Sequence, residues 1–367
     1  MIQITRTQLF TLILIFEIGS TTLFALGIGA KQDAWIVIIL STLVGLFLVF
    51  VYTQIPRYYP NQNFRDILVD VLGKKIAFPL LFLYGLNFLS GASHNFYEFG
   101  AVIKLTALPK TPLLIILYLY IIVIVYILSL GFEVLARTSE ILVPIFLIFL
   151  ITTYILTLFS GQFDLSALQP VLGNGITPIL SELYKVIGFP FGEMVVFLLF
   201  WHYLKEPEKI RKTAFLAVGT SAILLTLSLI VMISILGAEL AANSQIPLLE
   251  TILVINIGDI ITNLDIIAVL LMFIGGFFKT ALHFYGFVLV ISWIFNTKRM
   301  KLIMIISGLL FPWFVVYRFP GLDEQRWKGP DLRQIYEIPL TALLPILLLI
   351  IIILKKKSTS RKENESA

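Results

Sequence analysis

The sequence predicts an all-α integral membrane protein with ten transmembrane helices, on the basis of its composition, its uncharged tracts and its charge distribution. Of the 367 residues, 59% are hydrophobic and 13% are charged, about half the charged fraction of a typical soluble domain. Tracts such as 34–52 and 112–130 carry no charge at all. Because an α-helix rises about 1.5 Å per residue, each such tract can cross a hydrocarbon core about 30 Å thick.

The order of apolar and charged segments predicts the spans and their orientation. We place the spans at 8–29, 33–53, 77–101, 112–130, 138–159, 179–203, 213–237, 264–295, 300–317 and 336–354. The loops on the side of the N-terminus carry 18 basic residues, and the opposite loops carry 7. The positive-inside rule therefore places both termini in the cytoplasm. We expect residues 1–357 to form one membrane domain, and residues 358–367 to form a charged, disordered cytoplasmic tail.

Two outer connections are longer than simple turns. The stretch Pro247–Ile257 is apolar but too short to span, so we expect a short helix that lies along the outer face as a lid or re-entrant segment. The segment Arg318–Glu337 is polar and interrupted by prolines, which predicts an exposed loop. The first apolar run has no small-residue cleavage site after it and is expected to be a retained span.

Several chemistries are excluded or left without support. The chain has no cysteine, which excludes disulfides and thiolate metal sites. It also lacks a phosphate-binding loop, the zinc motif His-Glu-x-x-His and the nucleophile motif Gly-x-Ser-x-Gly. We therefore expect no enzyme activity, no metal and no cofactor. The net charge of +5 is attributed to cytoplasmic loops that face the anionic lipid bilayer, and no nucleic-acid partner is expected.

Two spans, five apart in the chain, carry matching interruptions. The first is interrupted over Glu17–Thr22 and the sixth over Gly188–Glu193, where glycine and proline disfavour continuous helix. Broken helices at corresponding positions of two halves indicate a central binding site between inverted repeats. The alternative is a helix kink that serves only close packing, and for the first span the sequence favours neither interpretation. The predicted ligand-binding residues are Gly19, Ser20, Thr21, Thr22, Gly188, Phe189, Phe191, Gly192 and Glu193.

Backbone amides released at the two breaks would suit an anionic ligand group such as a carboxylate. For Glu193, capping of the following helix is nearly as probable as a ligand role, because a helix N-terminus stabilises an acid. The third and eighth spans supply ionisable residues that follow small residues, and we expect Glu17, Ser93, Lys279 and His283 to line the pocket or to couple ligand binding to a change of state. Lys279 lies near the middle of its span, where a lysine must be paired or solvated. It could face a cavity as a proton acceptor, stand in for a bound cation, pair with Glu17 or Glu193, or extend to an interface.

A set of short motifs resembles a known family over nearly the whole chain. The motifs are Gly19-Ser20, Asp33-Ala34-Trp35, Tyr59-Pro60, Leu108-Pro109-Lys110-Thr111-Pro112, Gly131-Phe132-Glu133-Val134-Leu135-Ala136-Arg137-Thr138-Ser139-Glu140, Gln169-Pro170-Val171-Leu172 with Gly175-Ile176, and Pro190-Phe191-Gly192-Glu193. In order and spacing this set resembles the B subunits of bacterial spore germinant receptors (the GerAB family). The broken spans resemble the amino acid–polyamine–organocation permease superfamily, with its LeuT-like five-plus-five inverted repeat.

The resemblance implies a permease-like subunit in the inner membrane of a spore. It would bind a small nutrient, such as an amino acid, and act with an A subunit and a C-subunit lipoprotein. Lys279 interrupts the neighbourhood where superfamily members bind sodium, which puts sodium coupling in doubt and leaves the coupling ion open. The alternative function is a proton-coupled amino acid permease that shares the fold and the pocket.

Overall fold

We analysed a computed structural model, which describes residues 3–60, 62–255, 265–321 and 337–366, with side chains described up to residue 357. The α-helices are α1 (Arg6–Ile18), α2 (Ala34–Tyr58), α3 (Phe64–Leu72), α4 (Lys74–Thr106), α5 (Leu113–Leu130), α6 (Phe132–Leu158), α7 (Thr177–Gly188), α8 (Ile210–Asn243), α9 (Pro247–Leu253), α10 (Asp265–Ile294), α11 (Met300–Arg318) and α13 (Leu344–Ser366). Shorter helical segments are η1 (Thr21–Leu23), η2 (Ile28–Asp33), η3 (Leu165–Leu168), η4 (Phe191–Leu199), η5 (Trp201–Tyr203), η6 (Pro207–Lys209) and η8 (Pro339–Leu343).

Eight helices in the described ranges are long and apolar enough to cross a membrane. The first and sixth predicted spans are not among them, because each is divided into a short α-helix and 3₁₀ segments. The broken helices predicted from the sequence are therefore confirmed. The all-helical membrane fold is confirmed as well, although helix length alone supports eight continuous spans and not ten.

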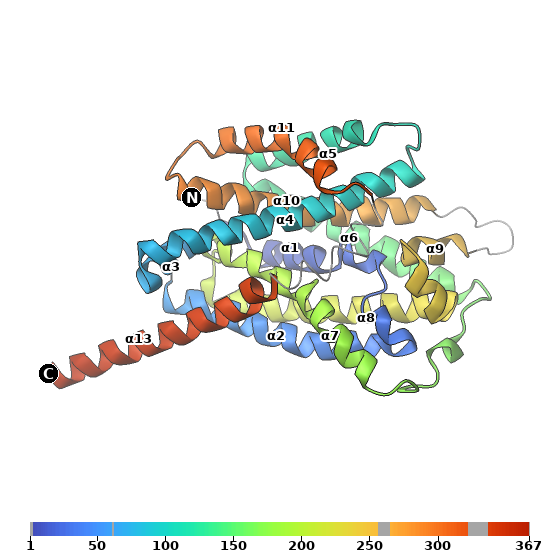
Figure 1. The fold of residues 1–367 in the computed structure, drawn as a ribbon, viewed down its shortest axis with the longest axis horizontal. Coiled ribbons are helices and arrows are strands. Elements are labelled where there is room, and N and C mark those ends of the chain that lie inside the picture. The colour runs from blue at the N-terminus through green and yellow to red at the C-terminus, as the bar shows by residue number, and fades with distance from the viewer. Residues whose placement is uncertain (1–2, 61, 256–264, 322–336, 367) are drawn as a thin grey trace.

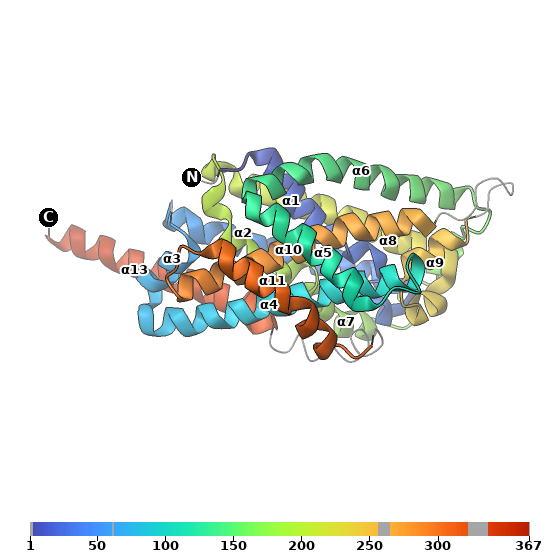
Figure 2. The same cartoon turned by 90° about the horizontal axis from the view of Figure 1, so that it is seen from above.

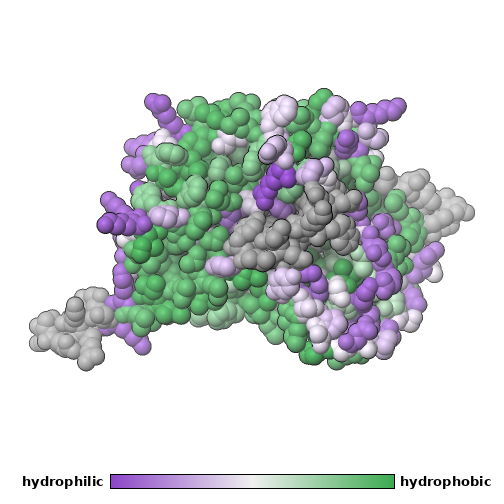
Figure 3. Space-filling view, viewed as in Figure 1, coloured by the Kyte–Doolittle hydropathy of each residue, from purple (hydrophilic) through white to green (hydrophobic). Residues whose placement is uncertain are grey.

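The long helices run roughly along one axis of the molecule (Figure 1). α4 packs along α10, and α1 packs against α6, α8 and α10 near the centre of the bundle. In two perpendicular views both termini lie at the same end (Figures 1 and 2). Apolar residues cover the broad middle of the molecule, and hydrophilic residues gather toward its ends (Figure 3). This pattern is expected if the long axis of the bundle runs along the membrane normal, with the apolar middle in the hydrocarbon core.

The structure adds an element that the span assignment missed. α3 lies between the second and third spans and buries Phe64, Ile67, Leu68 and Val71. Its N-cap is Asn63, whose side chain accepts a hydrogen bond from the amide of Asp66. One buried face and one polar face are typical of a helix that lies at a membrane interface.

The two long outer connections differ in how far they are described. α9 falls within the predicted lid and packs against η1, α8 and α10. Pro247, Leu248, Thr251 and Ile252 are buried there, so this helix covers the segment that follows the first break. Residues 256–264 and most of the predicted exposed loop, residues 322–336, lie outside the described ranges.

Candidate functional site

The first break is attached to α4 by side-chain hydrogen bonds. α1 ends at Ile18, and η1 begins at Thr21 after two non-helical residues. The hydroxyl of Ser20 donates to Oδ1 of Asn95 at 2.9 Å. The side-chain amide of Asn95 (Nδ2) in turn donates to the carbonyl oxygen of Gly91 at 2.9 Å. Asn95 thereby fixes the broken segment against the third span.

Glycine is required at the first break because two backbones touch there. A Cβ atom added to Gly19 would lie 2.5 Å from Cα of Gly275 on α10, and one added to Gly275 would lie 2.2 Å from the carbonyl carbon of Gly19. Both distances are far below van der Waals contact. The pair therefore brings the end of α1 against the middle of α10, as small residues do between membrane helices.

The second break is held by the start of the last span. α7 ends at Gly188, and η4 begins after the cis Phe189-Pro190 peptide. The hydroxyl of Tyr52 on α2 donates to the carbonyl oxygens of Thr341 on η8 and, at 3.5 Å, of Gly192. The hydroxyl of Tyr84 on α4 donates to the carbonyl oxygen of Leu340 at 2.9 Å. Tyr52 thus connects η4 to η8, and Tyr84 attaches η8 to α4.

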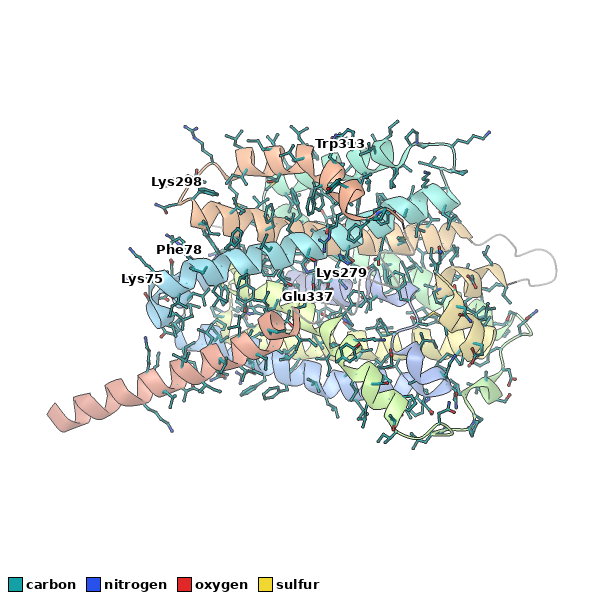
Figure 4. The ribbon with its side chains drawn as sticks, viewed as in Figure 1. Lys75, Phe78, Lys279, Lys298, Trp313 and Glu337 are labelled. Atoms are coloured by element: carbon teal, nitrogen blue, oxygen red, sulfur yellow. The ribbon has the colours of Figure 1, made fainter. Side chains whose placement is uncertain are left out.

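Lys279 joins the two breaks at the centre of the bundle (Figure 4). Its Nζ atom lies 2.8 Å from Oε2 of Glu193 on η4 and donates to the hydroxyl of Thr21 on η1 at 3.1 Å. It also lies 3.9 Å from the ring centroid of Phe189 and 5.4 Å from that of Phe16. The side chains of Lys279 and Glu193 are 0% and 2% exposed. Of the roles left open by the sequence, the structure shows the ion pair with Glu193, and the buried ammonium does not reach an interface.

Glu17 lies next to this ion pair without joining it. Its side chain is fully buried, and neither carboxylate oxygen has a hydrogen-bond partner among the described residues. It interacts electrostatically with Lys279 and with Glu193. The sequence left the direction of Glu17 open, and the structure directs it into the site between the two breaks.

Two other predicted pocket residues lie on the walls. His283 is one turn from Lys279 and its Nδ1 atom lies 3.1 Å from the Lys279 carbonyl oxygen. Its ring packs 5.1 Å from that of Phe16. Ser93 lies on α4, where its hydroxyl accepts a hydrogen bond of 2.6 Å from Arg318. Both residues are buried; His283 packs α10 against α1 through Phe16, and Ser93 links α4 to α11 through Arg318.

Arg318 is a site residue that the sequence reasoning missed. It was counted among the outer-loop charges, yet its guanidinium group donates to both Ser93 and Ser90, the second bond being 2.9 Å. The following residue, Phe319, packs edge-on against the ring of His94 at 4.7 Å and 5.2 Å from Tyr97. The only sequence signal was an arginine placed directly at the end of an apolar span.

The amides predicted to hold an anionic group are partly engaged. The amide of Gly19 donates to Ile15 at 2.9 Å, and the amide of Phe189 donates to Lys185 at 2.9 Å. Proline has no amide hydrogen. Within the predicted cradle this leaves the amides of Ser20, Thr21 and Thr22 at the first break and those of Phe191 and Gly192 at the second.

A hydrogen bond far from the breaks connects the two halves of the chain. Asp33, at the start of α2, accepts a hydrogen bond of 2.9 Å from the amide of Leu172. The side chain of Gln32 donates to the carbonyl oxygen of Pro170 at 3.1 Å. Two of the sequence motifs, 139 residues apart at Asp33 and Leu172, are thus in contact at the entrance to α7.

A cavity of about 480 Å³ lies elsewhere, between α3, α4 and the first turns of α13. Apart from Lys75 and Tyr84, its lining is aliphatic, with Leu68, Leu80 and Leu348 among the residues. It contains neither break, so we place the candidate site at Lys279 and not in this cavity.

Comparison with known proteins identifies the family. The sequence pattern of a family described as "Spore germination protein" matches residues 3–320. The chain belongs to this family. Spore germination protein KB of Bacillus subtilis (strain 168) is 33% identical over 94% of this chain and 93% of its own length. Spore germination protein YndE of the same organism is 22% identical over 86% of each chain, and spore germination protein XB of Bacillus anthracis is 25% identical over 80% of each.

Solved transporters share the fold of this spore germination family member at low identity. MhsT in complex with L-phenylalanine matches with a TM-score of 0.66 and 14% identity, over 96% of this chain and 88% of its own. MHP1, a nucleobase-cation-symport-1 family transporter solved with bromovinylhydantoin bound, matches with a TM-score of 0.63 and 14% identity, over 96% and 93%. These matches confirm the LeuT-like transporter fold. Family and fold are permease-like and not those of an enzyme class.

Proposed function

We propose that this chain is the membrane-embedded B subunit of a spore germinant receptor. A small nutrient, most simply an amino acid, binds between the two broken helices and biases a conformational equilibrium that triggers germination. The observation that carries the proposal is the contact of Lys279 with both breaks, at Glu193 and at Thr21. A ligand that enters between the breaks must rearrange these contacts, and so it binds the two states with different affinity.

The family supports the biological context of the proposal. Germination proteins of Bacillus subtilis match nearly the full length of this chain, and the solved MhsT structure holds an amino acid in the same fold. We extend these similarities to a subunit of the inner spore membrane, with both termini in the cytoplasm, that acts with an A subunit and a C-subunit lipoprotein. Both described ends of the chain lie at one end of the molecule, which is consistent with this orientation (Figure 2).

A dose–response experiment on Gly192 tests the proposed site. A Cβ atom at Gly192 would lie 3.1 Å from Oγ1 of Thr341 and 3.0 Å from the carbonyl oxygen of Ile187, so Gly192→Val crowds the second break. In spores whose only germinant receptor contains this chain, we expect the variant to raise the nutrient concentration for half-maximal germination by at least about tenfold. Gly219→Val is the matched control, because nothing lies within 4 Å of a Cβ atom at Gly219.

Receptor abundance in each spore preparation is measured by immunoblot against the same chain. An unchanged dose response of Gly192→Val at normal abundance would contradict the proposed site. Uptake of labelled amino acids into proteoliposomes separates the receptor from the permease with the same pocket. Rapid accumulation driven by a proton gradient would favour the permease, whereas binding without accumulation fits the receptor.

A further inference from the structure

The central site contains more acidic than basic side chains. Two carboxylates, Glu17 and Glu193, share it with one ammonium, that of Lys279. Glu193 forms an ion pair with this ammonium at 2.8 Å, and Thr21 accepts a hydrogen bond from it. Glu17 is therefore a second buried acid that has no cation of its own.

An ionised carboxylate in this position would be costly. Both oxygens of Glu17 are buried without a hydrogen-bond donor in the described part of the chain, and a buried charge without a partner costs several kcal/mol. With the site empty, the lowest-cost state has a proton on Glu17. With the site filled, the proton can be replaced by a ligand group that brings one positive charge.

The surrounding groups limit which charge the ligand can bring. From α10, Lys279 and His283 approach, and from η4 comes Glu193. On α2, Tyr52 interacts electrostatically with Glu17, and the buried residues of α8 include no charged side chain. On α6, Glu140 accepts a hydrogen bond of 3.1 Å from Gln8 at the other end of α1. Glu337, a buried acid at the start of the last span, has an interaction of its own. Among these neighbours the one lysine, Lys279, is already paired with Glu193. The charged groups around Glu17 therefore favour binding of a cation over binding of an anion.

We propose that Glu17 is the acceptor for the ammonium group of the ligand, and that its proton leaves to solvent as the ammonium binds. The ligand class is then a small zwitterionic amino acid or a primary amine. For a primary amine, one ammonium replaces one proton and the net charge of the site does not change. A zwitterionic amino acid also brings a carboxylate, so with it the net charge of the site falls by one as the proton leaves. The inference rests on the proposed function and specifies its ligand chemistry. An amino acid would place its ammonium at Glu17 and its carboxylate toward the amides of Phe191 and Gly192, at the N-terminus of the nine-residue η4.

Matched ligands test the inference on the purified full-length chain in lipid nanodiscs. The first set is L-alanine, ethylamine, which lacks the carboxylate, and propionate, which lacks the ammonium. The second set is L-valine, isobutylamine and 3-methylbutanoate, and D-glucose is the neutral control. We expect ligands that raise the unfolding temperature to carry an ammonium group, and the deaminated analogues to bind at least about 100-fold more weakly.

Glu17→Gln keeps the size of the side chain and removes its charge. We expect it to weaken binding of ammonium ligands at least about tenfold, because a charge-assisted hydrogen bond is lost. The matched control is Glu140→Gln, a carboxylate on α6 away from the breaks, which should bind as the unmodified chain does. Calorimetry of the unmodified chain in buffers with different ionisation enthalpies should show about one proton released per ligand at neutral pH. This measurement does not require Glu17→Gln to fold.

The outcomes separate this inference from the proposed function. Binding that is sensitive to Gly192→Val but equal for deaminated analogues, or that releases no proton, would overturn the role of Glu17 and keep the site. Binding that follows sodium when it is exchanged for choline, and not the ligand's ammonium, would also overturn it. Absence of stabilisation by all twenty L-amino acids and the matched compounds would overturn both.

Discussion

Gly19 and Gly275 touch through their backbones, so that the end of the first broken span lies directly on the eighth span. No side chain fits at either position without moving main-chain atoms, as the 2.2 Å and 2.5 Å distances show. Because Lys279 follows Gly275 by four residues on the same helix, this contact fixes the position of Lys279 relative to η1 and η4.

The first prediction concerns this contact. Gly275→Ala should lower the free energy of unfolding by about 3 kcal/mol, the upper end of the usual cost of overpacking, because its Cβ atom would overlap the backbone of Gly19 and not a movable side chain. Gly219→Ala has open space and lies inside α8. It should be neutral or stabilise by up to about 1 kcal/mol through helix propensity. Denaturant titration in detergent compares the two, and equal stability of both variants would contradict the close packing.

The second prediction concerns the buried ion pair. Lys279→Met leaves Glu193 buried without its ammonium partner, so it should cost about 3–5 kcal/mol of unfolding free energy. The double variant Lys279→Met with Glu193→Leu removes both charges and should recover most of that loss. A double-mutant cycle measured by thermal and denaturant unfolding provides the coupling energy. Additive losses would show that the two side chains do not interact.

The third prediction concerns Arg318. Its two hydrogen bonds to Ser90 and Ser93 hold the end of α11 against α4. Arg318→Ala should loosen this contact and open the outer side of the site. Since the chain has no native cysteine, Thr22→Cys is a unique reporter at the first break. A membrane-impermeant maleimide should label it at least about tenfold faster when Arg318 is replaced, as expected for the loss of 1.5–3 kcal/mol per charge-assisted bond.

The control for this experiment is Arg299→Ala. Arg299 is exposed and occupies the N-cap position at the other end of α11, where its side chain makes no capping hydrogen bond. It should leave the labelling rate of Thr22→Cys unchanged. A rate that does not respond to Arg318→Ala would show that the guanidinium group does not restrict access.

The fourth prediction concerns the contact between the halves. Asp33→Ala removes the acceptor for the buried amide of Leu172 and should destabilise the chain by about 1–3 kcal/mol. Hydrogen exchange at Leu172 should accelerate with it. Gln162→Ala, in the same outer connection and exposed, should change neither quantity. Unaltered exchange at Leu172 in Asp33→Ala would exclude the contact.

The fifth prediction is a pH dependence in the exposed loop before α7. The pKa of Asp164 is lowered because the hydroxyl and the amide of Ser166 both donate to its carboxylate. A lowered pKa means that the carboxylate stabilises the loop above its ordinary pKa of about 3.9 and loses this effect as the pH falls through the lowered value. Amide exchange at Ser166, corrected for its intrinsic pH dependence, should lose protection on acidification, and Asp164→Asn should show less pH dependence.

The sequence predicted the membrane fold because hydropathy and charge bias act on whole segments. The breaks were predictable too, since Gly188, Pro190 and Gly192 oppose helix in one short run. The partner of Lys279 was not predictable, because Glu17 and Glu193 both lie at predicted breaks, and only the folded breaks decide which carboxylate meets the ammonium. Arg318 was missed for a similar reason. Whether an arginine at a helix end faces water or a neighbouring span depends on the packing of α4 and α11, which no local pattern contains.

The roles of the predicted ligand-binding residues remain predictions. The structure brings Thr21, Phe189 and Glu193 to Lys279, and Gly19 and Gly192 permit close backbone approach. The single-domain organisation and the disordered tail predicted for residues 358–367 likewise remain predictions.

The attachment of η8 to the second break gives the last helix a mechanical property. Tyr52 holds its first turn beside Gly192, and Tyr84 attaches that turn to α4. From there the helix continues through Lys357, and α13 extends beyond the rest of the bundle (Figure 1). The helical run from Pro339 to Lys357 has 19 residues and is about 28 Å long. If a rearrangement of the second break displaced η8, the last helix would transmit this displacement toward its C-terminal end. The chain thereby has a direct route by which an event within the membrane becomes a movement outside it.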